Sequence, residues 1–124
     1  MNRRDALTLL LAGGSAGVFA QETARFAGLL RTGGCAVMIR HAATVPGVGD
    51  PPNFRLGDCS TQRLLNDAGR AQSRRIGQWF RAQQLQARTV QSSAWCRCRD
   101  TADLAFGQHA VLAALNSTFD DNSR

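Results

Sequence analysis

The feature that most constrains the fold is an alternation of strand-length apolar runs with helical segments. Residues 35–39 (CAVMI) form a continuous apolar run, which is typical of a strand covered on both faces of its sheet. The segments that follow predict, in order, a helix, a strand, a second helix and a third strand over residues 64–86, 88–93, 97–107 and 110–116. This order is a βαβ pattern, and it predicts an α/β fold with a mostly parallel sheet.

Local signals support the helices and the loop between them. Asn66 is a favourable N-cap, Asp67 suits the first helical turn, and Gly107 is a typical C-terminal stop. In the helix over residues 64–86, apolar residues fall at helical spacing and form the expected inner face: Ala68, Ala71, Ile76, Trp79, Phe80 and Leu85. Arginines form its expected solvated face: Arg70, Arg74, Arg75 and Arg81. A further short helix is predicted over residues 24–31, and three prolines and three glycines make residues 45–58 a loop.

The first residues have the layout of a secretory signal peptide, residues 1–20, with a charged start and an apolar run from residue 6 onward. Arg3 and Arg4 partly match a twin-arginine export signal. An uncleaved membrane anchor is the alternative, but glycines interrupt the apolar run, which is short for the ~20 residues that a spanning helix needs. We therefore expect cleavage, export to the periplasm, no membrane attachment afterwards, and one domain over residues 21–124.

The charge is strongly basic but diffuse. The isoelectric point is about 10.9 and the formal charge +6, and all fifteen basic residues are arginine. Arginine's planar fork of donors suits carboxylates and phosphates. No basic run is interleaved with aromatic residues, so the sequence does not predict a nucleic-acid partner.

An even number of cysteines fits an oxidising compartment, where disulfides persist. The four are Cys35, Cys59, Cys96 and Cys98. A bridge from Cys59 to either Cys96 or Cys98 is compatible with the sequence, which leaves the choice open. A single C-x-C pair lacks the spacing of a zinc site, so no metal is predicted.

Polar side chains follow two of the predicted strands. Arg40 and His41 end the first strand, and Ser92 and Ser93 end the second, whereas His109 precedes the third. In a parallel sheet, the first two pairs would meet at the carboxyl rim, where ligands bind, and His109 would lie at the opposite rim. A neutral imidazole is a nucleophile near physiological pH, and the neighbouring guanidinium is an anion receptor.

Three motifs over residues 34–107 resemble, in order and spacing, the histidine phosphatase superfamily, also called phosphoglycerate mutase-like. They are an apolar strand ending in R-H-A, an L-x-x-x-G-x-x-Q helix and S-S-x-x-x-R-x-x-x-T-A. The matching residues are Arg40, His41, Leu65, Gly69, Gln72, Ser92, Ser93, Arg97, Thr101 and Ala102. The resemblance implies a three-layer αβα domain.

The resemblance also implies a reaction, in which His41 accepts a phosphoryl group as phosphohistidine and water then releases phosphate. Arg40 and Arg97 would bind the phosphoryl oxygens, and Arg63 is a further candidate contact. Arg99, beside the family's arginine, is expected at the surface. The expected substrate is a phosphorylated small molecule, a phosphatase is favoured over a mutase, and no cofactor is implied.

The sequence departs from the family in three places. Ala42 replaces the commoner glycine after the histidine. Ser117 stands where relatives often carry an acid, which leaves Asp120 or Asp121 as candidate proton donors to the leaving group. Relatives also continue with a helix and a strand ending in a second histidine, beyond Arg124.

The third departure predicts the amino-terminal portion of a histidine phosphatase domain, with apolar surface exposed beside residues 35–39. Two hypotheses follow from it. One is a phosphatase with weakened activity, and the other is an inactive remnant or phosphate-binding module without turnover.

Overall fold

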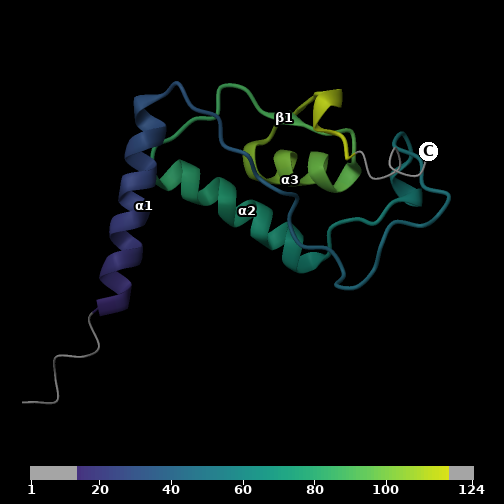
Figure 1. The fold of residues 1–124 in the computed structure, drawn as a ribbon, viewed down its shortest axis with the longest axis horizontal. Helices are drawn as coiled ribbons and strands as arrows, with labels where there is room; N and C mark the ends of the chain where they lie inside the picture. Colours follow the sequence, from purple (N-terminus) through teal and green to yellow (C-terminus); the bar gives the residue numbers. More distant parts are fainter. Residues whose placement is uncertain (1–13, 118–124) are drawn as a thin grey trace, which may run out of the picture. The chain divides into compact units, whose positions relative to one another are not determined.

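The computed structural model describes residues 14–117, which fall into two compact units divided between Ala36 and Val37 (Figure 1). The first unit holds one helix, α1 (Gly14–Thr32), which begins well before the predicted start at residue 24. It ends where Gly33 and Gly34 adopt positive φ angles of 75° and 71°, a conformation that glycine tolerates. The residues from 14 to 117 include no helix long and apolar enough to cross a membrane.

The predicted buried strand over residues 35–39 is wrong for this structure. The segment is irregular, and Val37, Met38 and Ile39 are 41%, 86% and 44% exposed. A strand exists only when a neighbour satisfies its backbone hydrogen bonds, and no described strand lies beside this segment. The apolar run is therefore exposed in this structure.

The second unit contains a short parallel sheet of β1 (Gln91–Ser92) and β2 (Ala110–Val111), joined through helix α3 (Cys96–Phe106). Gln91 pairs with Ala110 and Ser92 with Val111, so the predicted parallel βαβ connection is confirmed. The predicted third strand over residues 110–116 is shorter than expected, because a 3₁₀ turn, η2 (Ala113–Leu115), follows β2 directly. The α/β class holds, and the three-layer arrangement remains a prediction.

Helix α2 (Asp67–Ala82) begins as predicted, with the Asn66 side chain accepting a hydrogen bond of 2.8 Å from the Gly69 amide. Its buried residues are small ones spaced four apart, Gly69, Ser73 and Gly77. The expected apolar face is only half-buried at Ile76, Trp79 and Phe80. The prediction of the buried face was therefore wrong: close backbone approach, rather than large apolar side chains, defines it.

The close approach of α2 is visible at two glycines. A Cβ atom at Gly77 would lie 2.0 Å from the Ala105 carbonyl oxygen of α3, and one at Gly69 would lie 2.0 Å from the Ala43 carbonyl oxygen. Helix α3 ends at Gly107, whose φ of 71° is the predicted left-handed stop. Helix α2 thus packs against both α3 and the segment after His41.

The loop over residues 45–58 is irregular, as predicted, and leads into the 3₁₀ turn η1 (Cys59–Thr61). A disulfide joins Cys59 to Cys96, which resolves the alternative that the sequence left open, and Cys98 is a free thiol. The buried Gln62 adds a second tie, since its Oε1 accepts a bond of 2.9 Å from the Cys96 amide. The loop is therefore fastened to the start of α3.

Candidate active site

The main chain after His41 is held by side chains from α2 and α3. The Ala42 amide donates to Thr101 Oγ1 at 3.0 Å, and the Ala43 amide donates to Gln72 Oε1 at 3.0 Å. Ala42 is 3% exposed. Because these bonds fix the backbone on both sides of the Ala42–Ala43 peptide, the position of His41 is defined without a regular strand.

The hydrogen bonding of His41 selects one tautomer. Its Nδ1 lies 2.8 Å from the Ala42 carbonyl oxygen, which accepts and never donates. Nδ1 therefore carries the proton of the neutral ring, and Nε2 holds the lone pair.

The pKa of His41 is lowered from its usual 6.5, chiefly by burial and further by the positive charges of Arg97, Arg40 and Arg63, while the bond to the Ala42 carbonyl acts in the opposite direction. The imidazole is therefore predominantly neutral at pH 7, with the Nε2 lone pair available.

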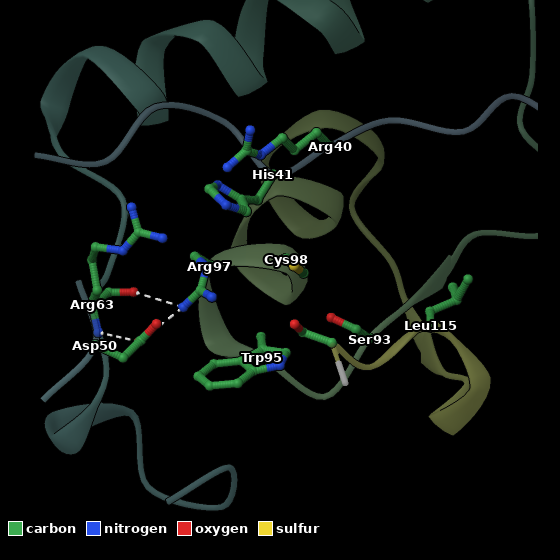
Figure 2. Close-up of a pocket in the computed structure, with 10 residues that line it drawn as sticks. Arg40, His41, Asp50, Arg63, Ser93, Trp95, Arg97, Cys98 and Leu115 are labelled. Carbon is green, nitrogen blue, oxygen red and sulfur yellow. Dashed lines mark hydrogen bonds and ion pairs between the residues drawn. The ribbon is translucent and has the colours of Figure 1, made fainter. Parts of the chain in front are cut away.

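A pocket of about 370 Å³ surrounds this ring, large enough for a small phosphate ester. Most of the lining groups are cationic or polar (Figure 2). They are Arg40, His41, Asp50, Arg63, Ser93, Trp95, Arg97, Cys98, Leu115 and Ser117. The pocket therefore offers an anion three guanidinium groups beside a neutral imidazole.

Arg97 lies at the centre of this arrangement, between His41 and Trp95 in Figure 2. It belongs to the first turn of α3 and is 6% exposed. Its Nη1 forms an ion pair of 2.9 Å with Asp50 Oδ1, and its guanidinium lies 4.4 Å from the centre of the Trp95 ring. Its buried Nε has no hydrogen-bond partner among the described residues, so one donor of the fork remains for a ligand.

Arg63 and Ser93 add further donors. Arg63 Nη1 donates to Thr44 Oγ1 at 2.6 Å, which aims the side chain, while its buried Nε has no partner in the described part of the chain. Ser93 is 5% exposed, and its hydroxyl likewise lacks a partner there. Buried donors are normally satisfied by protein, water or a ligand, so these groups are available to an oxyanion that enters the pocket.

The structure brings together the sequence-predicted residues Arg40, His41, Arg63 and Arg97. Asp120 and Asp121, the predicted proton donors, lie outside the described residues. Ser117, at the position expected for the family's acid, does line the pocket.

Ser92, which was predicted at the same rim as His41, is not in the pocket lining, and neither are His109 and Arg99, which were predicted to stand apart. The Ser92 hydroxyl donates to the Ser93 carbonyl oxygen rather than to a ligand. His109 pairs with Asp103 at 2.7 Å.

Sequence reasoning missed Asp50 and Trp95. Asp50 lies in a loop whose proline and glycine content predicts only irregular structure, so nothing in the pattern indicates that its carboxylate turns inward. Trp95 is two residues before Arg97, and an aromatic ring at that spacing from a candidate site arginine was the available signal.

Comparison with protein families supports the class that this geometry suggests. The family model described as "Histidine phosphatase superfamily (branch 1)" matches residues 36–121, which is well over half of the chain. The chain belongs to this superfamily, and the match spans His41, α2, α3 and every residue of the pocket. No curated protein and no solved structure matches the chain.

Proposed function

We propose that the protein hydrolyses a phosphomonoester through a phosphohistidine on His41. The observation that carries the proposal is the hydrogen bond from His41 Nδ1 to the Ala42 carbonyl, which leaves the Nε2 lone pair beside three guanidinium groups. Membership of the histidine phosphatase superfamily supports the same reaction class.

The first step is attack of His41 Nε2 on phosphorus. The N–P bond forms, the ester P–O bond breaks, and the bonding electrons leave with the alkoxide oxygen, which takes up a proton. The phosphoryl oxygens carry the developing charge, and Arg40, Arg63 and Arg97 stabilise it electrostatically. Nδ1 keeps its proton throughout, so the phosphorylated ring is an imidazolium hydrogen-bonded to the Ala42 carbonyl.

The second step is attack of water on the phosphohistidine. The O–P bond forms, the N–P bond breaks, and the electron pair returns to Nε2. One proton of the attacking water passes to the solvent, inorganic phosphate leaves, and the neutral ring is regenerated. A cofactor is not needed for either step, and the polar pocket admits the water.

The leaving group also needs a proton. Ser117 lines the pocket but is not acidic enough for general-acid catalysis, and Asp120 or Asp121 remain our proposed donors. Aryl phosphates, whose alcohols leave without assistance, are therefore expected to react faster than alkyl phosphates.

A second candidate function is phosphate binding without turnover. The observation that favours it is that Asp50 is the one carboxylic acid among the described pocket residues, and it is engaged with Arg97. In this case the three arginines bind phosphate, but leaving groups are not expelled.

One experiment separates the two. The purified chain is assayed with p-nitrophenyl phosphate and, separately, quenched with base after exposure to a ³²P-labelled substrate to trap an acid-labile phosphoryl adduct. We expect turnover and adduct in the natural chain and in His109→Ala, the matched control at the other histidine, and neither in His41→Ala. Phosphate binding without adduct or turnover would select the binding module.

We further propose that the protein is exported to the periplasm. The predicted signal peptide and the disulfide between Cys59 and Cys96 both support an oxidising compartment. Fractionation of cells, with N-terminal sequencing of the mature chain, tests this.

A further inference from the structure

The loop over residues 45–58 delivers a carboxylate into a pocket that is otherwise cationic. The Asp50 side chain is 8% exposed, and its partner Arg97 is 7% exposed. Removing a carboxylate from water is unfavourable unless an opposite charge and further hydrogen bonds compensate for it. Both compensations are present here, so the placement of Asp50 is specific.

Asp50 Oδ1 accepts two hydrogen bonds of 2.9 Å, one from Arg97 Nη1 and one from the backbone amide of Arg63 (Figure 2). The bond from the amide holds the carboxylate on the main chain just before α2, independently of Arg97. The carboxylate is thus a fixed point from which the guanidinium of Arg97, on α3, is oriented.

The planar geometry of a guanidinium then determines what remains for a ligand. Nη1 lies on the side of the fork opposite to the Nε–H, and the Nε–H shares its edge with one N–H of Nη2. Asp50 occupies Nη1 and the Trp95 ring lies against the group, while the buried Nε has no partner in the described chain. The edge left unoccupied is the one that binds two oxygens of a phosphoryl group in parallel.

We propose that Asp50 is a positioning residue for Arg97: by binding Nη1 it presents the Nε edge of Arg97 to the phosphoryl group. This inference rests on the proposed phosphate-binding function of the pocket. Asp50 acts through Arg97 and does not contact the reacting atoms.

The sign of the effect distinguishes this role from a simple counter-ion. Removing a negative charge makes the pocket more positive, which by itself tightens phosphate binding. Loss of a positioning contact has the opposite effect, because a misaligned Arg97 binds less well in spite of the added net positive charge.

The test measures binding of inorganic phosphate by titration calorimetry, together with kcat/KM for p-nitrophenyl phosphate, on the full chain. Asp50→Ala should weaken both by about tenfold. Asp50→Asn keeps an acceptor oxygen for both N–H groups and should stay within about threefold of the natural chain. Asp100→Ala and Asp100→Asn, at an exposed position of α3 outside the pocket, are the matched controls for net charge and should change neither quantity.

A double-variant comparison isolates the route through Arg97. In an Arg97→Ala background, Asp50→Ala should change phosphate affinity by less than about twofold, because the group it positions is gone. Neither of these two variants leaves Arg97 buried without its partner, so the comparison does not require Asp50→Ala alone to fold. Arg97→Ala keeps the Asp50 carboxylate on the Arg63 amide, and circular dichroism of both variants checks that they are folded.

Three outcomes overturn the proposal. They are tighter phosphate binding by Asp50→Ala, full additivity with Arg97→Ala, and loss of turnover in Asp50→Asn confined to alkyl phosphates at unchanged phosphate affinity, which would mark a general acid. If the natural chain itself binds no phosphate, the proposed function fails first; if it binds phosphate and Asp50→Ala binds equally well, only the positioning role fails.

Discussion

Reduction of the disulfide is the perturbation with the largest expected effect on both stability and the pocket. Cys59 and Cys96 are 37 residues apart in the sequence, and Cys96 is 1% exposed. The bridge joins η1, at the end of the loop that carries Asp50, to the first residue of α3, which precedes Arg97. Opening it frees the loop relative to the helix.

The magnitude follows from the length of the closed loop. Cross-linking residues this far apart restricts the unfolded chain by about 4 kcal/mol at 25 °C on the chain-entropy relation. Domains of this size are typically stable by only about 5–15 kcal/mol, so this contribution is a large share. For a denaturant dependence of about 1–2 kcal/mol per molar of urea, the urea midpoint should fall by about 2–4 M.

The assay is equilibrium urea unfolding followed by tryptophan fluorescence, with the oxidised chain, the reduced chain and Cys59→Ala/Cys96→Ala compared. Cys35→Ser is the matched control, since Cys35 is free and exposed and its loss leaves the bridge intact. The reduced chain and the double variant should agree, and both should bind phosphate more weakly than the oxidised chain. Midpoints that coincide in oxidised and reduced samples would refute the reasoning, because the bridge would then restrict nothing in the unfolded state.

Three further predictions concern the site and its support. The pKa of His41 is lowered, and the proposed nucleophile is the neutral ring, so kcat/KM should rise with pH to a midpoint below 6.5 and then level off. NMR titration of the His41 ring in a His109→Gln chain checks this, and a midpoint above 6.5 would contradict it. Arg97→Lys should lower kcat/KM by about 10²-fold, since a point charge cannot bind two oxygens in parallel, and a change under threefold in steady-state assays would count against the fork. Gly77→Ala should destabilise the fold by about 1–3 kcal/mol, because its Cβ would meet the Ala105 carbonyl at 2.0 Å, and urea unfolding measures this. Ala71→Gly, the reverse exchange in the same helix, measures the contribution of helix propensity alone.

The parts of the fold that depend on local chemistry were predictable from the sequence. The N-cap at Asn66, the stop at Gly107 and the parallel pairing of β1 with β2 follow from residues close in the chain. The strand over residues 35–39 was not predictable in the same way, because its formation depends on partner strands rather than on its own apolar content.

The site was predictable where a motif marks it and not elsewhere. Arg40, His41 and Arg97 belong to short patterns that indicate phosphate chemistry without any structure. Asp50 reaches the pocket through the path of an irregular loop, and such a path depends on contacts far away in the sequence, here with Arg63 and Arg97.

Residues of two of the family motifs share one structural role, which is to hold the peptide units that follow His41. Thr101 Oγ1 accepts from the Ala42 amide while its hydroxyl donates to the Arg97 carbonyl at 2.7 Å, so the same threonine links the backbone next to His41 to the backbone of Arg97.

Helix α2 completes the support from the other side. Gln72 accepts from the Ala43 amide, and the missing side chain at Gly69 admits the Ala43 carbonyl, which accepts from the Asn66 amide at 3.2 Å. Gly69 and Gln72 are three residues apart, so they lie on the same side of one turn of α2, and both contact the main chain of Ala43. Because these contacts come from helices, the main chain beside His41 is held in place although residues 35–39 form no strand. Substitutions at Thr101 or Gln72, which do not line the pocket, should therefore disturb the position of His41.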